Sequence, residues 1–388
     1  MMFESIMWWI LAILTIIGGV AAIDHFCSGC VKKFNLIAYF RLQRRQRQQD
    51  SMTEPSGTVP LNSPFYVERQ PIESECYQNI GEPDALIRVK APRQFGKSSL
   101  LVRILAQAER RLDCRTVCLS FQQADNEIFS HLDQFLYWFC GSVTVQLGLP
   151  NKLADNWQGV LGSKSKCNDY FEKYLLTKIT QPLVLGLDEV DMIFVHEIIA
   201  AEFFALLRVW HEKGKNKAPW NRLRMVITHS QEVYVPLKMD QSPFNVGIAV
   251  ELPEFTEEQV RDLVRRYQLA LTDEQIVQLV KLVGGHPYLV QVALYQIAHK
   301  RLTLEQILTV AAYEDGPYSD HLRRHRLNLE KYAELAQEVK RVMGADAPLP
   351  VKEVKEVFRL RSMGLVKVKD NRVMPLCDLY RRYFNDRL

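Results

Sequence analysis

The stretch that decides the fold is Ala91-Pro92-Arg93-Gln94-Phe95-Gly96-Lys97-Ser98. A short β-prone run over residues 85–89 comes before it, and a pattern typical of a helix over residues 98–111 comes after it. The last three residues of the stretch fit the pattern GxxxxGK(S/T), in which a strand turns into a helix around a phosphate group. The stretch and its two flanks therefore predict a phosphate-binding loop (P-loop).

The chemistry of phosphate binding explains each residue type at the end of this loop. Gly96 lets the backbone curl so that amide N–H groups point at phosphate oxygens, and the following helix adds the positive end of its dipole. Lys97 is expected to reach the β- and γ-phosphates, and the Ser98 hydroxyl is expected to take one coordination place on Mg2+. The predicted nucleotide-binding residues of the loop extend through Ser99.

The first position of the loop departs from the pattern. Ala91 stands where the pattern has glycine, and alanine can serve there if its φ is negative. The alternative interpretation is an incidental glycine turn at a strand–helix junction.

A second acidic motif supports the first. Residues 183–187 are almost wholly apolar, as expected for a strand buried on both faces, and they run directly into Asp188 and Glu189. Carboxylates are costly to bury unless a metal or a cation accompanies them. Asp188 is therefore predicted to hold Mg2+, directly or through water, and Glu189 to orient and polarise an attacking water. Asp191 is interpreted as a cap of the helix that follows.

A further strand over residues 223–228 ends in polar residues. Thr228, His229 and Ser230 all qualify by type to contact the γ-phosphate or the water, and the sequence does not choose among them. A simple strand-end turn is the alternative. Strands alternate with helices from residue 85 to residue 228, and a long apolar helix is expected over residues 128–146. This alternation predicts an α/β fold, a parallel sheet with helices on both faces.

The order of the motifs resembles the AAA-like domain family of P-loop ATPases, of the cyanobacterial type, which is similar to signal-transduction (STAND-type) and archaeal ATPases. The residues that carry the resemblance are 91–99, 187–191, 228–232, 252–256 and 284–289. The resemblance implies ATP as the nucleotide, and a helical lid in which a Gly-x-Pro segment lies against it. That segment corresponds to Gly285, His286 and Pro287, for which a capped turn with a packed histidine is the alternative. Arg208 is either an arginine finger for a neighbouring subunit or a surface salt-bridge partner.

The C-terminal part has the outline of a winged helix. A helix over residues 351–363, two short strands and a closing helix follow one another. Four basic residues lie on or beside the first of these helices, namely Lys352, Lys355, Arg359 and Arg361. Glu353 and Glu356 dilute their charge, so packing against protein is favoured over DNA, which stays possible. The segment 321–325 is basic, and we predict that it forms a solvated helix face, with contact to phosphate or to an acidic partner surface as the alternative.

The N-terminal end predicts one membrane span. Residues 5–23 carry no charge, and a helix of that length just crosses a bilayer core. A cleaved signal peptide is the alternative, but the only early charge is Glu4 rather than a basic region. Residues 31–50 carry six Lys or Arg against Asp50, which favours a cytoplasmic C-terminal body. Cys27 and Cys30 are candidates for lipidation, or for two of the ligands of a metal site.

The formal net charge is +4, and residues 31–50 alone supply +5 (six basic residues minus one acidic), so the rest of the chain is close to neutral. This balance gives no general case for nucleic-acid binding. We expect a transmembrane helix (1–24), a basic juxtamembrane segment and linker (25–63), an ATPase core (64–253), a lid (254–317) and a winged-helix domain (318–388). The predicted function is a membrane-anchored regulatory switch that binds and hydrolyses ATP with Mg2+ and acts through a protein partner or a homo-oligomer. A DNA-associated ATPase and a nucleotide-binding scaffold with little turnover are the alternatives.

Overall fold

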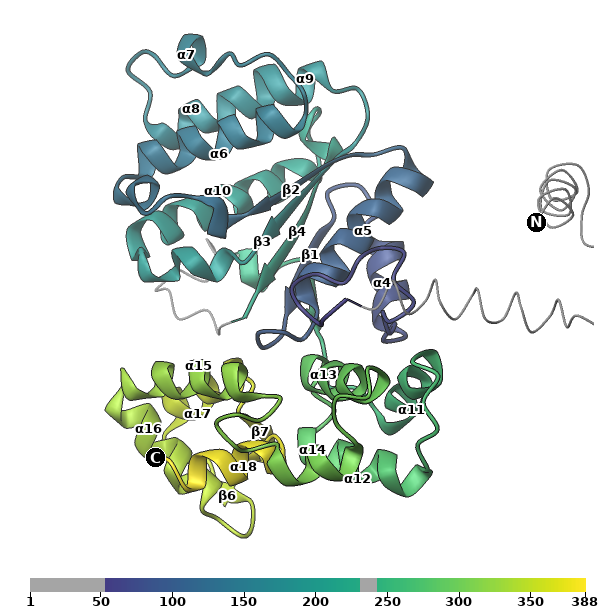
Figure 1. Cartoon of the computed structure of the whole chain (residues 1–388). Helices are drawn as coiled ribbons and strands as arrows, with labels where there is room; N and C mark the ends of the chain where they lie inside the picture. Colours follow the sequence, from purple (N-terminus) through teal and green to yellow (C-terminus); the bar gives the residue numbers. More distant parts are fainter. Residues whose placement is uncertain (1–52, 231–242) are drawn as a thin grey trace, which may run out of the picture. The chain divides into compact units, whose positions relative to one another are not determined.

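Five parallel strands form the central sheet, in the order β2-β3-β4-β1-β5 (Figure 1). The computed structural model describes residues 53–230 and 243–388, and Glu54–Leu388 form one unit. The strands are β1 (Leu86–Lys90), β2 (Arg115–Ser120), β3 (Leu183–Asp188), β4 (Leu223–His229) and β5 (Ile248–Glu251). Every residue of β3 and β4 is buried, which explains the apolar run 183–187 of β3, whereas β4 also buries Arg224, Thr228 and His229.

Helices cover both faces of this sheet, as predicted. On one face lie α4 (Ile72–Asn79) and α5 (Lys97–Leu112), and on the other lie α6 (Leu132–Gln146), α8 (Ser163–Tyr170) and α10 (Glu197–Gly214) (Figure 1). Short elements connect them: η1 (Phe121–Gln123), η2 (Asn126–Ser130), α7 (Leu153–Asn156), η3 (Phe171–Leu175), α9 (Leu176–Lys178), η4 (Val190–Val195), η5 (Trp220–Arg222) and η6 (Pro243–Asn245).

The strand order sets the geometry of the site. Because β4 lies between β1 and β3, the P-loop after β1 and the acidic residues after β3 are one strand apart. The register pairs Lys90 with His229, and Ser120 with Asp188. Since all five strands are parallel, these residues meet at one edge of the sheet.

A helical lid follows the sheet, as predicted. It consists of α11 (Glu257–Arg266), α12 (Asp273–Val283), α13 (Pro287–Ala298) and α14 (Leu304–Val310). Three of these helices begin with a threonine and a glutamine that cap each other's backbone, at Thr256, Thr272 and Thr303. The exception is α13, which begins with a proline after two glycines of positive φ, Gly284 and Gly285.

The C-terminal region, residues 318–388, combines helices with a small antiparallel sheet in the order β6-β8-β7. Its helices are α15 (Ser319–Glu330), α16 (Ala333–Met343), α17 (Val354–Ser362) and α18 (Asp378–Asn385). Its strands are β6 (Leu349–Pro350), β7 (Val366–Lys369) and β8 (Arg372–Pro375). The two strands and the closing helix that the sequence predicted are confirmed, and the two-residue β6 was missed.

Two other features differ from the sequence prediction. The helix expected over residues 128–146 is interrupted at His131, whose extended backbone (φ −139°, ψ 140°) separates the 3-10 turn η2 from α6. The edge strand β5 was also missed, because four residues give too little pattern to recognise. No helix among residues 53–230 and 243–388 has the length and apolar character needed to cross a membrane, and the predicted span, Cys27 and Cys30 lie outside the described residues.

Gly186 in the middle of β3 allows α5 to approach the sheet. A Cβ at Gly186 would lie 3.0 Å from the Cδ1 atoms of Leu101 and Leu105 and 3.2 Å from the Val117 carbonyl oxygen. We expect Gly186→Val to lower the free energy of unfolding by about 1–3 kcal/mol through overpacking, as measured by urea denaturation. Gly162→Val is the control, because nothing lies within 4 Å of a Cβ at that position. An equal loss of stability in both variants would contradict this account.

Candidate functional site

The P-loop has the backbone that its sequence predicted. Gly96 has a φ of 91°, and a Cβ there would lie 2.9 Å from Nη2 of Arg69. Within the loop, Gln94 also has a positive φ (64°), whereas Ala91 does not. Alanine therefore fits the first position of the loop without backbone strain.

Lys97 lies buried inside this loop. Its Nζ donates to the carbonyl oxygens of Ala91 (2.9 Å) and Pro92 (2.8 Å). Burial lowers the Lys97 pKa to about 8, and the negative charges of Asp191, Asp188 and other groups oppose that change only in part. A buried ammonium held by two neutral carbonyls gains an anionic partner when a phosphate enters the loop. The loop therefore fits a nucleotide phosphate.

The two serines after Lys97 have different surroundings. Ser98 is half-buried at the second residue of α5. Ser99 is buried, and its Oγ accepts a hydrogen bond of 2.9 Å from the backbone N–H of Val59. Arg103, one turn further along α5, donates to the carbonyl oxygens of Val59 and Pro60. Ser99 thus helps to hold the segment before the core against α5.

Thr228 joins the ends of β3 and β4. Its hydroxyl donates to Oδ1 of Asp188 and accepts from the backbone N–H of Glu189 at 3.1 Å. Asp188 is buried, and Glu189 follows it with a left-handed backbone (φ 57°). Thr228 is one of the three polar residues that the sequence left open, and it hydrogen-bonds both to the Asp188 side chain and to the Glu189 backbone.

Ser120, at the end of β2, contacts the same acidic pair. Its Oγ donates to Oε2 of Glu189 at 3.2 Å. Burial and the neighbouring Asp188 raise the pKa of Glu189, whereas the Ser120 hydrogen bond opposes that rise. Sequence reasoning missed Ser120, although its place at the end of the strand before β3 was a usable signal.

Asp191 makes a contact that the sequence did not predict, and the ring of His229 packs against an aromatic side chain. The sequence assigned Asp191 to a helix cap, but its Oδ1 accepts from the backbone N–H of Ser230 at 3.1 Å and so ties β4 to the acidic segment. That interpretation was wrong because the residue lies inside the 3-10 turn η4 rather than before a helix. The His229 ring packs against Phe244, with ring centroids 5.1 Å apart.

The lid touches the P-loop through His286. The His286 ring meets the Phe95 ring edge-on at a centroid distance of 4.5 Å, and Pro287 begins α13 beside it. His286 is buried, its Nδ1 has no hydrogen-bond partner among the described residues, and burial lowers its pKa to about 3. The neutral imidazole of His286 therefore packs between the lid and the loop.

The C-terminal region touches the P-loop as well. The amide oxygen Oε1 of Gln94 accepts a hydrogen bond of 2.7 Å from Nδ1 of His321, whose Nε2 pairs with the Tyr380 hydroxyl at 2.7 Å. A Cβ at Gly364, which has a φ of 77°, would lie 2.9 Å from Cβ of Pro92. The prediction of a solvated face for this part of α15 was wrong for His321, which is only 3% exposed, because the loop covers it.

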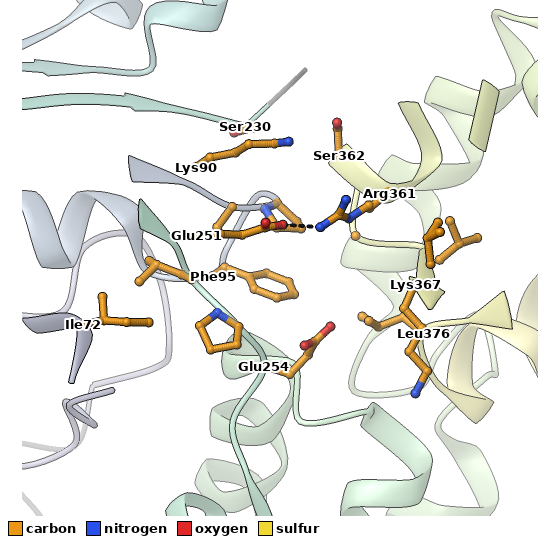
Figure 2. A pocket seen from close by; sticks show the side chains of 17 residues that line it. Ile72, Lys90, Phe95, Ser230, Glu251, Glu254, Arg361, Ser362, Lys367 and Leu376 are labelled. Carbon is orange, nitrogen blue, oxygen red and sulfur yellow. Dashed lines mark hydrogen bonds and ion pairs between the residues drawn. The ribbon is translucent and has the colours of Figure 1, made fainter. Parts of the chain in front are cut away.

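A cavity of about 400 Å³ lies beside these contacts, between the loop and the C-terminal region (Figure 2). Phe95 and Pro92 line it from the P-loop, and Gly364 lines it from the C-terminal region. An ion pair between Arg361 of α17 and Glu251 of β5 (2.6 Å) crosses it, as the dashed line in Figure 2 shows.

Arg208 lies on α10, where its Nη2 pairs with Glu212 at 3.0 Å, one turn further along the same helix. Arg208 therefore forms the salt bridge that the sequence analysis offered as one of its two roles. Its role as an arginine finger for a neighbouring subunit stays a prediction.

The sheet order, the P-loop and the acidic strand end together define the class of P-loop ATPases. The sequence profile of the AAA-like domain matches residues 54–386, and the chain belongs to the AAA-like domain family. The resemblance seen in the sequence is thereby confirmed.

The fold is similar to those of solved archaeal proteins. A Walker-type ATPase of Pyrococcus abyssi superposes with a TM-score of 0.60 at 12% identity, over 85% of this chain and 98% of the other. The ORC2 protein of Aeropyrum pernix, solved in ADPNP–ADP complexes, gives a TM-score of 0.51 at 14% identity, over 84% of this chain and 97% of the other. No curated protein matches the chain in sequence. At these identities the likeness concerns the fold alone.

Ser120→Ala tests the role of the Ser120 contact. Without this hydrogen bond the Glu189 pKa rises further, so Glu189 becomes protonated at a higher pH and the acid limb of the ATP turnover profile moves to higher pH. Ser163→Ala is the control, because it removes a hydroxyl bonded to Asp133, on α6, outside the site. An acid limb that stays in place or moves to lower pH would overturn the assignment of Glu189 as the base.

Proposed function

We propose that the protein is a membrane-anchored regulatory switch that binds and hydrolyses ATP, and that it acts through a partner or through self-association at the cytoplasmic membrane face. The observation that carries the proposal is the contact of Gln94 with His321, because it ties the conformation of the P-loop to the C-terminal region. A nucleotide that reshapes the loop thereby changes the free energy of that contact.

The chemistry follows from the residues at the strand ends. Lys97 neutralises charge on the β- and γ-phosphates, and Glu189 orients the attacking water and accepts its proton. Thr228 holds Asp188 and the backbone of Glu189 in place for these roles. ATP supplies the scissile phosphoanhydride bond.

Mg2+ fits the donor set at this edge. No group of three or more His, Cys, Asp or Glu side chains within 53–230 and 243–388 is arranged to hold a metal unaided. Mg2+ in nucleotide sites takes one or two protein oxygens, and phosphates and waters complete its shell. Ser98 and Asp188 are the residues proposed to provide those protein oxygens.

Three parts of the proposal rest on the sequence. They are the span over residues 1–24 with the cytoplasmic body, the STAND-like use of a C-terminal winged helix to hold the closed state, and a homo-oligomer in which Arg208 reaches a neighbouring site. The first of these needs a membrane-fractionation experiment, since the span lies outside the described residues.

The two alternatives have less support. Of the basic residues of α17, Arg359 lies over the Tyr332 ring at 4.5 Å and Arg361 pairs with Glu251, so both are used within the chain rather than presented to DNA. A nucleotide-binding scaffold without turnover leaves unexplained why Glu189 lies beside Asp188 with a raised pKa.

Glu189→Gln and Lys97→Ala test the chemistry. We expect Glu189→Gln to retain ATP binding and to lower turnover by about 100-fold or more, because the amide cannot take the proton. Lys97→Ala is expected to weaken ATP binding and abolish turnover. Binding and turnover are measured on the full chain in detergent, with oligomeric state followed by light scattering. A wild-type protein that neither binds nor hydrolyses ATP would refute the proposal.

His321→Leu tests the switch. This variant removes the hydrogen bonds to Gln94 and Tyr380, so we expect nucleotide to dissociate about tenfold faster, as measured with a fluorescent ATP analogue. His299→Leu is the matched control, because His299 is exposed at the end of α13 in the lid, where its Nδ1 bonds to the carbonyl of Tyr295 and its ring packs on that residue. Unchanged dissociation in a folded His321→Leu protein would show that the C-terminal region does not govern the loop.

A further inference from the structure

We propose that Arg69 is a positioning residue that couples the P-loop to the hinge between the ATPase core and the lid. This inference deepens the proposed function and rests on it, because it concerns how nucleotide in the loop moves the lid. Arg69 lies outside every motif that the sequence singled out.

The guanidinium of Arg69 bridges two segments that are far apart in the sequence. Its Nη1 donates to the carbonyl oxygen of Phe95 in the P-loop at 2.8 Å and to that of Pro253 at 3.3 Å. Pro253 lies between β5 and α11, where the chain leaves the sheet for the lid. The guanidinium carbon also lies 5.5 Å from the centre of the Phe255 ring, two residues further along. One side chain therefore holds both the loop and the hinge.

Arginine suits this place because of its shape and charge. Its planar fork can donate in several directions at once, which the single ammonium of lysine does less well. Nη2 fits against Gly96, where a Cβ would lie 2.9 Å from it, so the glycine required by the phosphate also admits the guanidinium. The buried Glu73 accepts from the backbone N–H of Arg69 at 2.7 Å and from the Tyr66 hydroxyl at 2.9 Å. The negative charge of Glu73 also opposes the lowering of the Arg69 pKa that burial causes.

A second path runs through the lid and returns to the same residue of the loop. The backbone N–H of Phe255 donates to the carbonyl oxygen of Gly285 at 2.8 Å, and the next residue, His286, packs its ring against Phe95. Phe95 is thus held by its carbonyl through Arg69 and by its ring through the lid. Because the loop must aim its amides at an arriving phosphate, a shift of Phe95 acts on the hinge along both paths.

Burial alone does not distinguish Arg69, and Arg224 shows this. Arg224 is also buried, donates to the carbonyl oxygen of Gly81 at 3.0 Å, and has an Nε without a partner among the described residues, as Arg69 does. It lies on β4 near the end of the strand opposite the site. Arg224 is therefore a matched control for the loss of a buried guanidinium.

The experiment measures ATP affinity and hinge motion separately in the full-length protein. Hydrogen exchange of the backbone over residues 250–258 is followed with and without ATP and Mg2+ in the wild type, in Arg69→Met and in Arg224→Met. We expect ATP to change exchange at the hinge of the wild type and of Arg224→Met. In Arg69→Met we expect ATP affinity within about tenfold of the wild type, with the change at the hinge reduced by more than about half. If circular dichroism shows that Arg69→Met is unfolded, Arg69→Lys takes its place with the same expected loss, because it keeps the charge near Glu73.

Four outcomes would overturn the inference. They are a hinge that responds normally in the Arg69 variant, a hinge that fails equally in Arg224→Met, a wild-type hinge that ignores bound ATP, and a folded Arg69 variant that loses more than about tenfold in affinity, which would make Arg69 a nucleotide contact. A wild-type protein that does not bind ATP refutes the proposed function itself. The two failures are thereby distinguishable.

Discussion

The buried ammonium of Lys97 is the constraint on which the rest of the structure depends. A lysine with only 6% of its surface exposed stays charged only if dipoles and opposite charges surround its ammonium. The loop supplies two carbonyl oxygens, and Asp188 and Asp191 at the neighbouring strand end supply negative charge. That arrangement requires a parallel sheet in which β4 alone separates the two strands. The order of the strands therefore brings together the groups that surround the Lys97 ammonium.

Phe95 is the point at which the three parts of the structure meet. Its ring contacts His286 of the lid, its carbonyl oxygen accepts from Arg69, and it lines the cavity that faces the C-terminal region. Two residues before it, the loop is exposed at Arg93, and Gln94 reaches His321. The backbone amides of such a loop bind phosphate, while its carbonyl groups and side chains contact other parts of the chain. Phosphate binding can therefore change the contacts of the loop with Arg69 and His321.

Much of the fold could be predicted because its signals are local. Residues 183–187 indicate a buried strand because they contain no polar side chain, and the capping box of Thr256 and Gln259 marks the start of α11. Where a boundary depends on a distant contact, the prediction failed. His131 breaks a helix that its neighbours would continue, and the four residues of β5 become a strand only by pairing with β1.

The sequence by itself determined the P-loop, the acidic strand end, the alternation of strands and helices, and the family. Those features depend on residues that are neighbours in the chain. The number of residues between two such groups predicts whether they share a face of a helix or strand, or a turn. Only the tertiary structure decided that Thr228 contacts Asp188, that Ser120 holds Glu189, and that Arg69 joins the loop to the hinge. Each of these contacts joins segments that lie far apart in the chain. A spacing rule carries no information about such pairs, because the packing of the sheet, the lid and the C-terminal region brings them together.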